Sequence, residues 1–237
     1  MGDFEAGYGN ENIQFIYNQL NSSDMKLYFI FLSYALKIIN EVNIEMQSED
    51  ARMHVLIPRM TQLYKQFCRN FIKKEALDET SIPNLNLSDN HLQVEQIYCG
   101  TEVEIYCHQA KLTESDLVPF KQNVKNFYIK FCHDLRKRIN FNDVTLNFLP
   151  KFSPKNVISG ATNSILPIIT KIFPEKELIN ASKINSEFRA LADYAEVKSK
   201  KELPICEFWA EVASFKNELG EYMFGNISRI VQGILSI

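Results

Sequence analysis

The stretch TESDLVPFKQNVKNFYIKFCHDLRKRI, residues Thr113–Ile139, decides the fold class. Its first four residues offer side-chain oxygens that accept hydrogen bonds from the free N–H groups at the start of a helix. Apolar residues and one cysteine then follow at offsets 0, 4, 7, 8, 11, 12, 15 and 19 from Phe120. Because these offsets keep them on one helical face for about five turns, the stretch predicts a long amphipathic α-helix.

The cations of this helix are the sharpest functional feature of the sequence. Residues 111–160 carry 9 Lys/Arg against 4 Asp/Glu, whereas the whole chain has a net charge of −3. We expect the basic side chains to share the face opposite the apolar stripe, where they could neutralise phosphates of DNA. They are Lys121, Lys125, Lys130, Arg136, Lys137 and Arg138. The aromatic residues belong to the apolar stripe, so base stacking is not indicated, and a solvated surface is the alternative.

A second long helix is predicted to begin near Met25, after the capping residues Asn21–Asp24. Its apolar stripe has helical spacing: Leu27, Ile30, Phe31, Tyr34, Ile38 and Val42. Phe29, Leu36 and Ile39 widen this stripe, which suggests burial on more than one side of the helix.

The remaining segments also favour helices. A run opened by Ser48–Asp50 contains Pro58, which should kink it or start a new helix, and a polar loop covers 77–91. Leu92–Cys107 fits either short helices or a small strand. Further helices are predicted over 161–172, 176–195, 205–219 and 227–236. The chain is therefore predicted to be all-α, with at most a minor strand near 92–107, and to comprise a flexible 1–12, a helical domain 13–196 and a C-terminal helical segment 197–237.

Composition places the chain among intracellular globular proteins. It is 46% hydrophobic and 23% charged, which is ordinary for a globular protein. The N-terminus lacks the apolar core of a secretory signal, and the most apolar stretch, Leu27–Ile39, is too short to span a membrane. The five cysteines form no Cys-x-x-Cys pair, which favours reduced thiols. We expect a nuclear or cytoplasmic protein without membrane attachment.

No catalytic motif is present in the sequence. It lacks phosphate-binding glycine loops and the Gly-x-Ser-x-Gly elbow of hydrolases. Cys99, Cys107 and His108 could converge on a zinc ion, but four ligands would have to come from three segments. We therefore expect no catalytic residue, no metal and no cofactor, and no small-molecule substrate is evident.

Three stretches together resemble one family. In Phe15–Asp50, a long apolar helix is followed by the motif Ile-Asn-x-x-Asn-x-x-x-Gln at 39–47. Phe120–Asp143 has the spacing F-x-x-x-V-x-x-F-Y-x-x-x-C-x-x-x-x-x-R. Leu203–Ile237 joins Phe-Trp, a polar break and an apolar run that ends on Ile-Leu-Ser-Ile. In this order they resemble the helical regions of hAT-superfamily transposases and their domesticated, BED-finger-type descendants, over most of 15–237.

The resemblance implies an irregular multi-helix domain equivalent to the helical insertion of such a transposase. In that family a ribonuclease-H-like core holds three acidic residues that bind divalent metal. The first two acids would then precede residue 1, the third would follow Ile237, and 197–237 would be a truncated edge of the core. No catalytic residue transfers to this chain, and no BED zinc finger precedes the matching region. The resemblance thus implies a catalytically inactive remnant, not an enzyme.

Two kinds of partner follow from these expectations. The leading hypothesis is a protein-interaction or self-association module, because C-terminal helices without their sheet would expose apolar residues. The expected interaction residues are Phe208, Trp209, Phe215, Tyr222 and Ile230. DNA binding by the cations of 121–138 is the runner-up, and an unrelated helical adaptor is a third reading.

Overall fold

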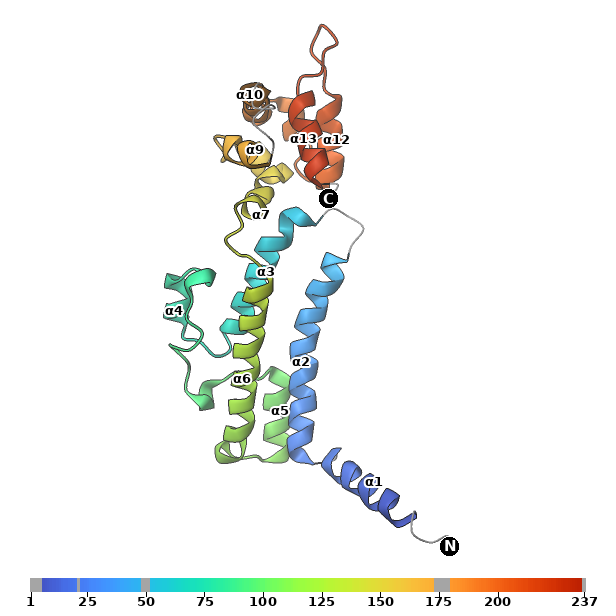
Figure 1. Ribbon diagram of the computed structural model, residues 1–237, viewed down its shortest axis with the longest axis vertical. Coiled ribbons are helices and arrows are strands. Elements are labelled where there is room, and N and C mark those ends of the chain that lie inside the picture. The colour runs from blue at the N-terminus through green and yellow to red at the C-terminus, as the bar shows by residue number, and fades with distance from the viewer. Residues whose placement is uncertain (1–5, 21, 48–51, 173–179, 236–237) are drawn as a thin grey trace. The chain divides into compact units, whose positions relative to one another are not determined.

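The structure, a computed structural model, describes residues 6–20, 22–47, 52–172 and 180–235 of the chain. The described residues form helices, and no β-strand occurs among them (Figure 1). The α-helices are α1 (Ala6–Leu20), α2 (Ser23–Met46), α3 (Met53–Cys68), α4 (Lys74–Glu79), α5 (Thr101–Ala110), α6 (Glu114–Arg138), α7 (Val144–Phe148), α8 (Pro154–Ser159), α9 (Leu166–Ile172), α10 (Ala181–Leu191), α11 (Ala195–Lys198), α12 (Ile205–Ser214) and α13 (Gly225–Leu235). The 3-10 helices are η1 (Ile82–Asn84), η2 (Val94–Gln96) and η3 (Leu149–Phe152). The all-α prediction is confirmed.

The minor strand considered for 92–107 is wrong, because η2 and α5 occupy that stretch. Gly100 precedes α5 with a φ of 103°, a left-handed conformation that suits glycine. Within α5, Val103 is buried while Tyr106 and Cys107 are half-buried. These three residues are at offsets 0, 3 and 4, which belong to one face of a helix.

Helix boundaries differ from the prediction mainly towards the ends of the chain. α1 begins at Ala6, inside the stretch predicted to be flexible. The helix predicted over 205–219 ends at Ser214, and Phe215 already has extended backbone angles. Three predicted features lie outside the described residues: the capping residue Asn21, the helix start at Ser48–Asp50, and the first part of the helix predicted over 176–195.

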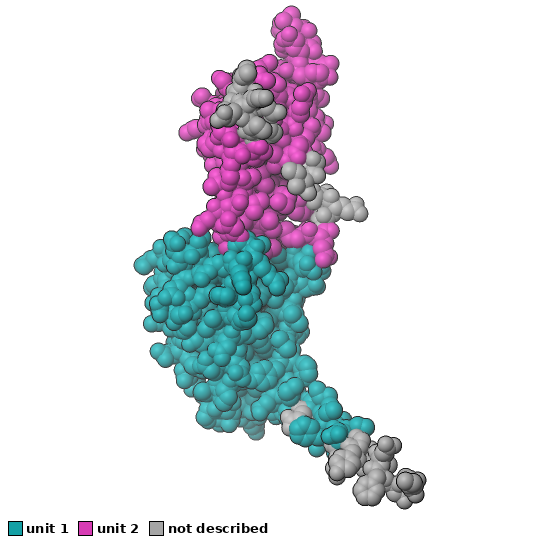
Figure 2. Space-filling model, in the orientation of Figure 1, with its two compact units in different colours: residues 1–44, 62–139 teal, residues 45–61, 140–237 magenta. Residues whose placement is uncertain are grey.

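The chain folds into two compact units, which Figure 2 shows in different colours. Unit 1 comprises Met1–Ile44 and Gln62–Ile139, and unit 2 comprises Glu45–Thr61 and Asn140–Ile237. The boundary between 196 and 197 that the sequence predicts does not separate compact units. Residues on both sides of it share the apolar core of unit 2, so 197–237 is not an edge that lacks a partner.

The core of unit 1 lies between α2, α3 and α6. The ring of Phe31 in α2 lies 5.6 Å from that of Tyr128 in α6, and Phe67 of α3 lies 5.7 Å from the same tyrosine. The Tyr128 hydroxyl donates a hydrogen bond of 2.9 Å to the carbonyl of Tyr98. Edge-to-face ring pairs of this kind each add about 0.5–1.5 kcal/mol beyond the buried area. Tyr128 therefore ties the three helices together.

α6 begins where the sequence predicts, directly after Thr113. The Thr113 hydroxyl accepts a hydrogen bond of 3.4 Å from the N–H of Asp116, and the Asp116 carboxylate accepts one of 2.9 Å from the N–H of Thr113. These reciprocal bonds form a capping box. The Thr113 hydroxyl also donates a hydrogen bond of 2.6 Å to the Asp116 carboxylate, and this bond together with the one from the Thr113 N–H lowers the pKa of that carboxyl below its ordinary value.

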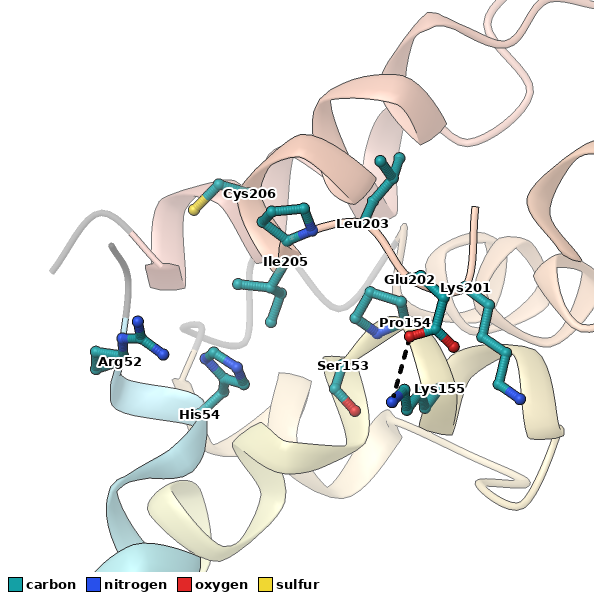
Figure 3. A pocket seen from close by; sticks show the side chains of 11 residues that line it. Arg52, His54, Ser153, Pro154, Lys155, Lys201, Glu202, Leu203, Ile205 and Cys206 are labelled. Atoms are coloured by element: carbon teal, nitrogen blue, oxygen red, sulfur yellow. Dashed lines mark ion pairs between the residues drawn. The ribbon is translucent and has the colours of Figure 1, made fainter. Parts of the chain in front are cut away.

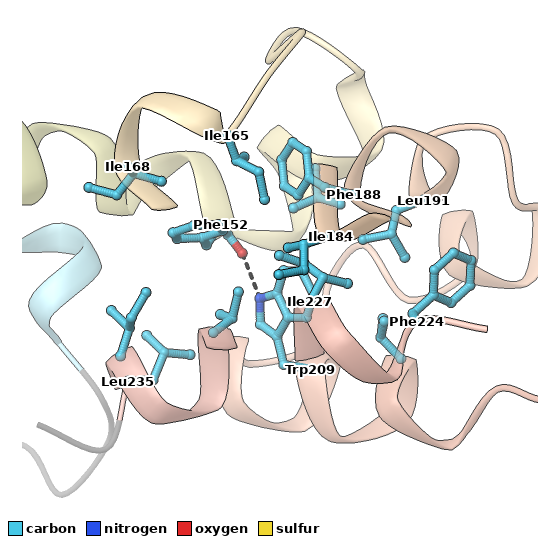
Figure 4. Packing of buried hydrophobic residues seen from close by; sticks show 14 of the residues in the cluster. Phe152, Ile165, Ile168, Ile184, Phe188, Leu191, Trp209, Phe224, Ile227 and Leu235 are labelled. Atoms are coloured by element: carbon cyan, nitrogen blue, oxygen red, sulfur yellow. Dashed lines mark hydrogen bonds between the residues drawn. The ribbon is translucent and has the colours of Figure 1, made fainter. Parts of the chain in front are cut away.

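The core of unit 2 surrounds Trp209 of α12 (Figure 4). The Trp209 indole N–H donates a hydrogen bond of 2.9 Å to the carbonyl of Phe152 in η3. The Phe152 ring meets the rings of Trp209 and of Phe188 in α10 edge to face, with centroids 6.3 and 6.1 Å apart. The one polar atom of the tryptophan is thus satisfied, so the ring can be buried without an unpaired donor.

Candidate interaction surface

The six cations of α6 do not share one face of the helix. At about 100° per residue, Lys121, Lys125 and Arg136 fall within about 60° of one another, whereas Lys130 and Lys137 lie about 160–180° from Lys121. Arg138 points in a third direction by the same count. The predicted basic face is therefore wrong, because the regular helix from Glu114 to Arg138 spreads these side chains around its circumference.

Three of these cations already bind groups of the protein itself. The Lys121 ammonium donates to the carbonyl of Glu95, and the Arg136 guanidinium donates to the carbonyl of Leu85 at 2.5 Å. Lys130 forms an ion pair of 3.0 Å with Asp134 one turn later. Lys125 is half-buried, and Lys137 and Arg138 are exposed. α6 thus presents fewer cations to an outside phosphate than its sequence suggests.

The C-terminal interaction residues also lie elsewhere than expected. Phe208 and Trp209 are 0% exposed, so the expectation that they form an apolar surface is wrong. Their burial has a clear cause, since α13 packs on α12 and the Phe152 ring of η3 meets the Trp209 ring edge to face. The other three are arranged differently: Phe215 and Ile230 are half-buried against that core, and Tyr222 is 61% exposed beneath the Lys216 ammonium.

Exposed apolar residues gather instead on α2 of unit 1. The side chains of Phe29, Leu32 and Leu36 are 51%, 36% and 56% exposed, and Ile39 is half-buried. Their spacing of three, four and three residues places them along one line of the helix. We call these four residues the α2 stripe. The sequence predicted burial on more than one side of α2, and the described part of the chain leaves this second side uncovered.

A second stripe faces the core from the same helix. Leu27, Phe31 and Ala35 are buried against unit 1, followed by Ile38 and Val42. Counted at about 100° per residue, the centres of the two stripes lie roughly 120° apart. α2 therefore has one apolar side that stabilises its own unit and one that lies open to solvent.

α1 adds exposed apolar residues of its own. Ile13, Ile16, Tyr17 and Leu20 are 66%, 56%, 62% and 47% exposed, at offsets 0, 3, 4 and 7. Such offsets form one face of a helix. No charged residue occurs from Ile13 to Leu20. In Figure 1, α1 extends away from α5 and α6, in agreement with this exposure.

α2 is also the helix, among the residues described, that is long and apolar enough to cross a membrane. Length and composition alone do not distinguish such a membrane span from the core helix of a soluble protein. The sequence predicts that Leu27–Ile39 is too short to span a membrane. The helix has 24 residues, so its length does not exclude a membrane span. The absence of a membrane partner stays a prediction.

Cysteine and histidine side chains do not gather into an evident metal site. Within the described ranges no group of three or more His, Cys, Asp or Glu residues could hold a metal ion. The closest thiols are Cys68 and Cys132 in the core of unit 1, whose sulfur atoms lie 3.6 Å apart. Burial raises the pKa of the Cys99 thiol to about 12 and also raises that of Cys107.

In comparisons with known proteins, no family model, curated protein or solved structure matches the chain. The relationship to hAT-superfamily transposases therefore stays a prediction.

Proposed function

We propose that the chain is a helical self-association module and that the α2 stripe pairs with the α2 stripe of a second copy. The observation that carries the proposal is the exposure of Phe29, Leu32 and Leu36 in one line on a helix of 24 residues. Such a helix is about 36 Å long, enough for roughly three heptads of a two-helix contact. Contiguous exposed apolar patches are typical of protein interaction sites.

The spacing of the stripe suits an antiparallel copy. Read in either direction, its four residues are separated by three, four and three positions. When two α2 helices cross at the midpoint of the stripe, Leu32 lies opposite Leu36 and Phe29 lies opposite Ile39. A two-fold symmetric contact needs such a self-complementary surface, because the same patch is used by both partners.

The charged residues of α2 lie off the proposed contact. Lys26 and Glu41 are exposed, but at about 100° per residue they lie roughly 100° and 160° from the centre of the α2 stripe. The proposed pair therefore brings apolar residues together without a charged residue in the line of the stripe.

Sedimentation velocity over a range of protein concentrations tests the proposal. We expect a weak dimer with a dissociation constant of roughly 1–100 μM, because the stripe is small. The variant Leu32→Glu/Leu36→Glu should be a monomer, since it places carboxylates opposite one another. The matched control Gln109→Glu/Ala110→Glu adds the same charge at exposed positions of α5 and should leave the dimer intact.

A monomeric wild-type chain at every concentration, with circular dichroism showing a folded protein, contradicts self-association.

DNA binding is the alternative that the sequence raised, and it has less support. Three of its six candidate cations bind carbonyl or carboxylate groups of the chain, and the six are spread around α6. Duplex binding that falls steeply with salt and drops on Lys125→Glu would favour this alternative over self-association.

A further inference from the structure

A cavity of about 430 Å³ lies within unit 2, and its lining shares no residue with the α2 stripe. Its walls come from three segments: the residues around the start of α8, the connection from α11 into α12, and the N-terminal end of α3 (Figure 3). The volume falls in the range typical of small-molecule sites. The size is therefore suited to a ligand of modest dimensions rather than to a polymer.

The lining of this cavity has an excess of positive charge. Arg52, Lys155 and Lys201 line it, and Glu202 is the carboxylate among them. Lys155 and Glu202 lie 3.4 Å apart, but their side chains are 66% and 76% exposed, so the pair is weak. An incoming anion can therefore compete with Glu202 for Lys155. Among the described residues of the lining there are three cations and one carboxylate, a balance that favours an anionic ligand.

Ser153 supplies a neutral donor at the same place. It occupies the position before α8, yet its hydroxyl accepts no hydrogen bond from the helix backbone. The backbone of Ser153 is hydrogen-bonded, but within the described part of the chain its hydroxyl has no other hydrogen bond either. Figure 3 shows this hydroxyl between His54 and Lys155. A serine hydroxyl next to lysine and arginine is a combination that recurs at phosphate-binding sites.

The inner part of the cavity is apolar. Pro154 and Ile205 line it and are buried in unit 2, and Leu203 is half-buried beside them. A bare inorganic anion would leave this part of the lining without a contact. A ligand that fills the cavity therefore combines an anionic group with an apolar body.

We propose that this cavity binds a small organic phosphate, with the phosphate group held by Arg52, Lys155, Lys201 and Ser153 and the organic group packed on Pro154 and Ile205. Guanidinium and ammonium groups favour phosphate over a carboxylate because three charged oxygens can be contacted at once. The site is separate from the proposed dimer contact, so either proposal can fail without the other.

Isothermal titration calorimetry of the full chain with phenyl phosphate tests the site. Inorganic phosphate and benzyl alcohol serve as the charge-only and apolar-only probes. Phenyl phosphate should bind at least about tenfold more tightly than either, because the ring buries apolar surface that phosphate alone cannot. Lys155→Gln and Lys201→Gln should each weaken binding roughly threefold, and added salt should weaken it further.

Two further variants separate ligand binding from a structural role. Glu202→Gln should tighten phenyl phosphate binding, because it removes the carboxylate that competes for Lys155. Lys183→Gln, at an exposed position of α10 outside the cavity, should change nothing. The proposal is overturned if phenyl phosphate gives no saturable heat. It is equally overturned if Lys155→Gln and Lys201→Gln leave binding unchanged or if Glu202→Gln weakens it.

Discussion

The carboxylate of Glu187 in α10 accepts a hydrogen bond of 2.9 Å from the backbone N–H of Ile227 in α13. It accepts another of 3.0 Å from the N–H of Asn226. The first N–H groups of a helix have no partner within the helix, and they carry its positive dipole end. Glu187 is only 7% exposed, so a buried carboxylate of α10 caps the start of α13.

Replacing this carboxylate should destabilise unit 2. Glu187→Ala leaves the buried N–H of Ile227 and the half-buried N–H of Asn226 without this partner, and we expect the free energy of unfolding to fall by about 1–3 kcal/mol in urea denaturation. Ser228→Ala is the matched control, because Ser228 is 1% exposed on the same helix but its hydroxyl has no hydrogen-bond partner in the described residues. Equal losses from both variants would contradict the capping role.

Gly100 should not tolerate a side chain. A Cβ atom there would lie 2.8 Å from Cγ of Tyr34, and the φ of 103° is unfavourable for any L-residue. Gly100→Ala should therefore lower the stability of unit 1 by about 1–3 kcal/mol, measured as a shift in the urea midpoint. Gly233→Ala in α13 meets no atom within 4 Å and should instead stabilise by about 0.5–1 kcal/mol.

The capping box of α6 predicts a specific acid sensitivity. The hydrogen bonds from Thr113 lower the pKa of Asp116 in the folded state. A lowered folded pKa contributes stability above the unfolded value of about 4, and this contribution is lost as the pH falls through the folded pKa. Asp116→Asn should therefore flatten the loss of stability between neutral and acid pH. Glu114→Gln, which makes no such hydrogen bond, should keep the wild-type slope.

Thiol labelling should distinguish the five cysteines. Cys206 is exposed, Cys107 is half-buried, and Cys68, Cys99 and Cys132 are buried. Burial raises the pKa of Cys99 to about 12 and also raises that of Cys107, so both thiols react more slowly than an exposed one at pH 8. We expect one fast-reacting thiol towards a disulfide reagent in the folded chain, and Cys206→Ser should remove it. A persistent fast phase in that variant would contradict the burial.

Long, regular patterns in the sequence predicted the fold well. α6 begins at its predicted cap, and the buried positions Phe120, Val124, Tyr128 and Cys132 belong to the predicted stripe. Capping and helical periodicity are local properties, so they can be read from neighbouring residues. The error at 92–107 arose because a short segment fits both the helical and the strand period of apolar residues. In the structure Gly100, with its positive φ, directly precedes a helix.

Surfaces were harder to predict than helices, because exposure depends on packing between distant segments. Phe208 and Trp209 have the same apolar character as Phe29 and Leu36, yet the first pair is buried and the second is exposed. Packing against distant segments explains the difference, as in the hydrogen bond from Trp209 to Phe152, 57 positions earlier, and the contact of α12 with α13. The cavity in unit 2 also combines three distant segments, so its residues had no common motif in the sequence.

Trp209 is the one tryptophan of the chain, and its indole is enclosed in unit 2 with its N–H bonded to Phe152. Its fluorescence emission is consequently a built-in optical reporter of that unit alone. A red shift of the emission marks the opening of unit 2, while circular dichroism follows the helices of both units. Comparing the two signals in one titration shows whether the halves of this chain unfold together or in sequence, without an attached label.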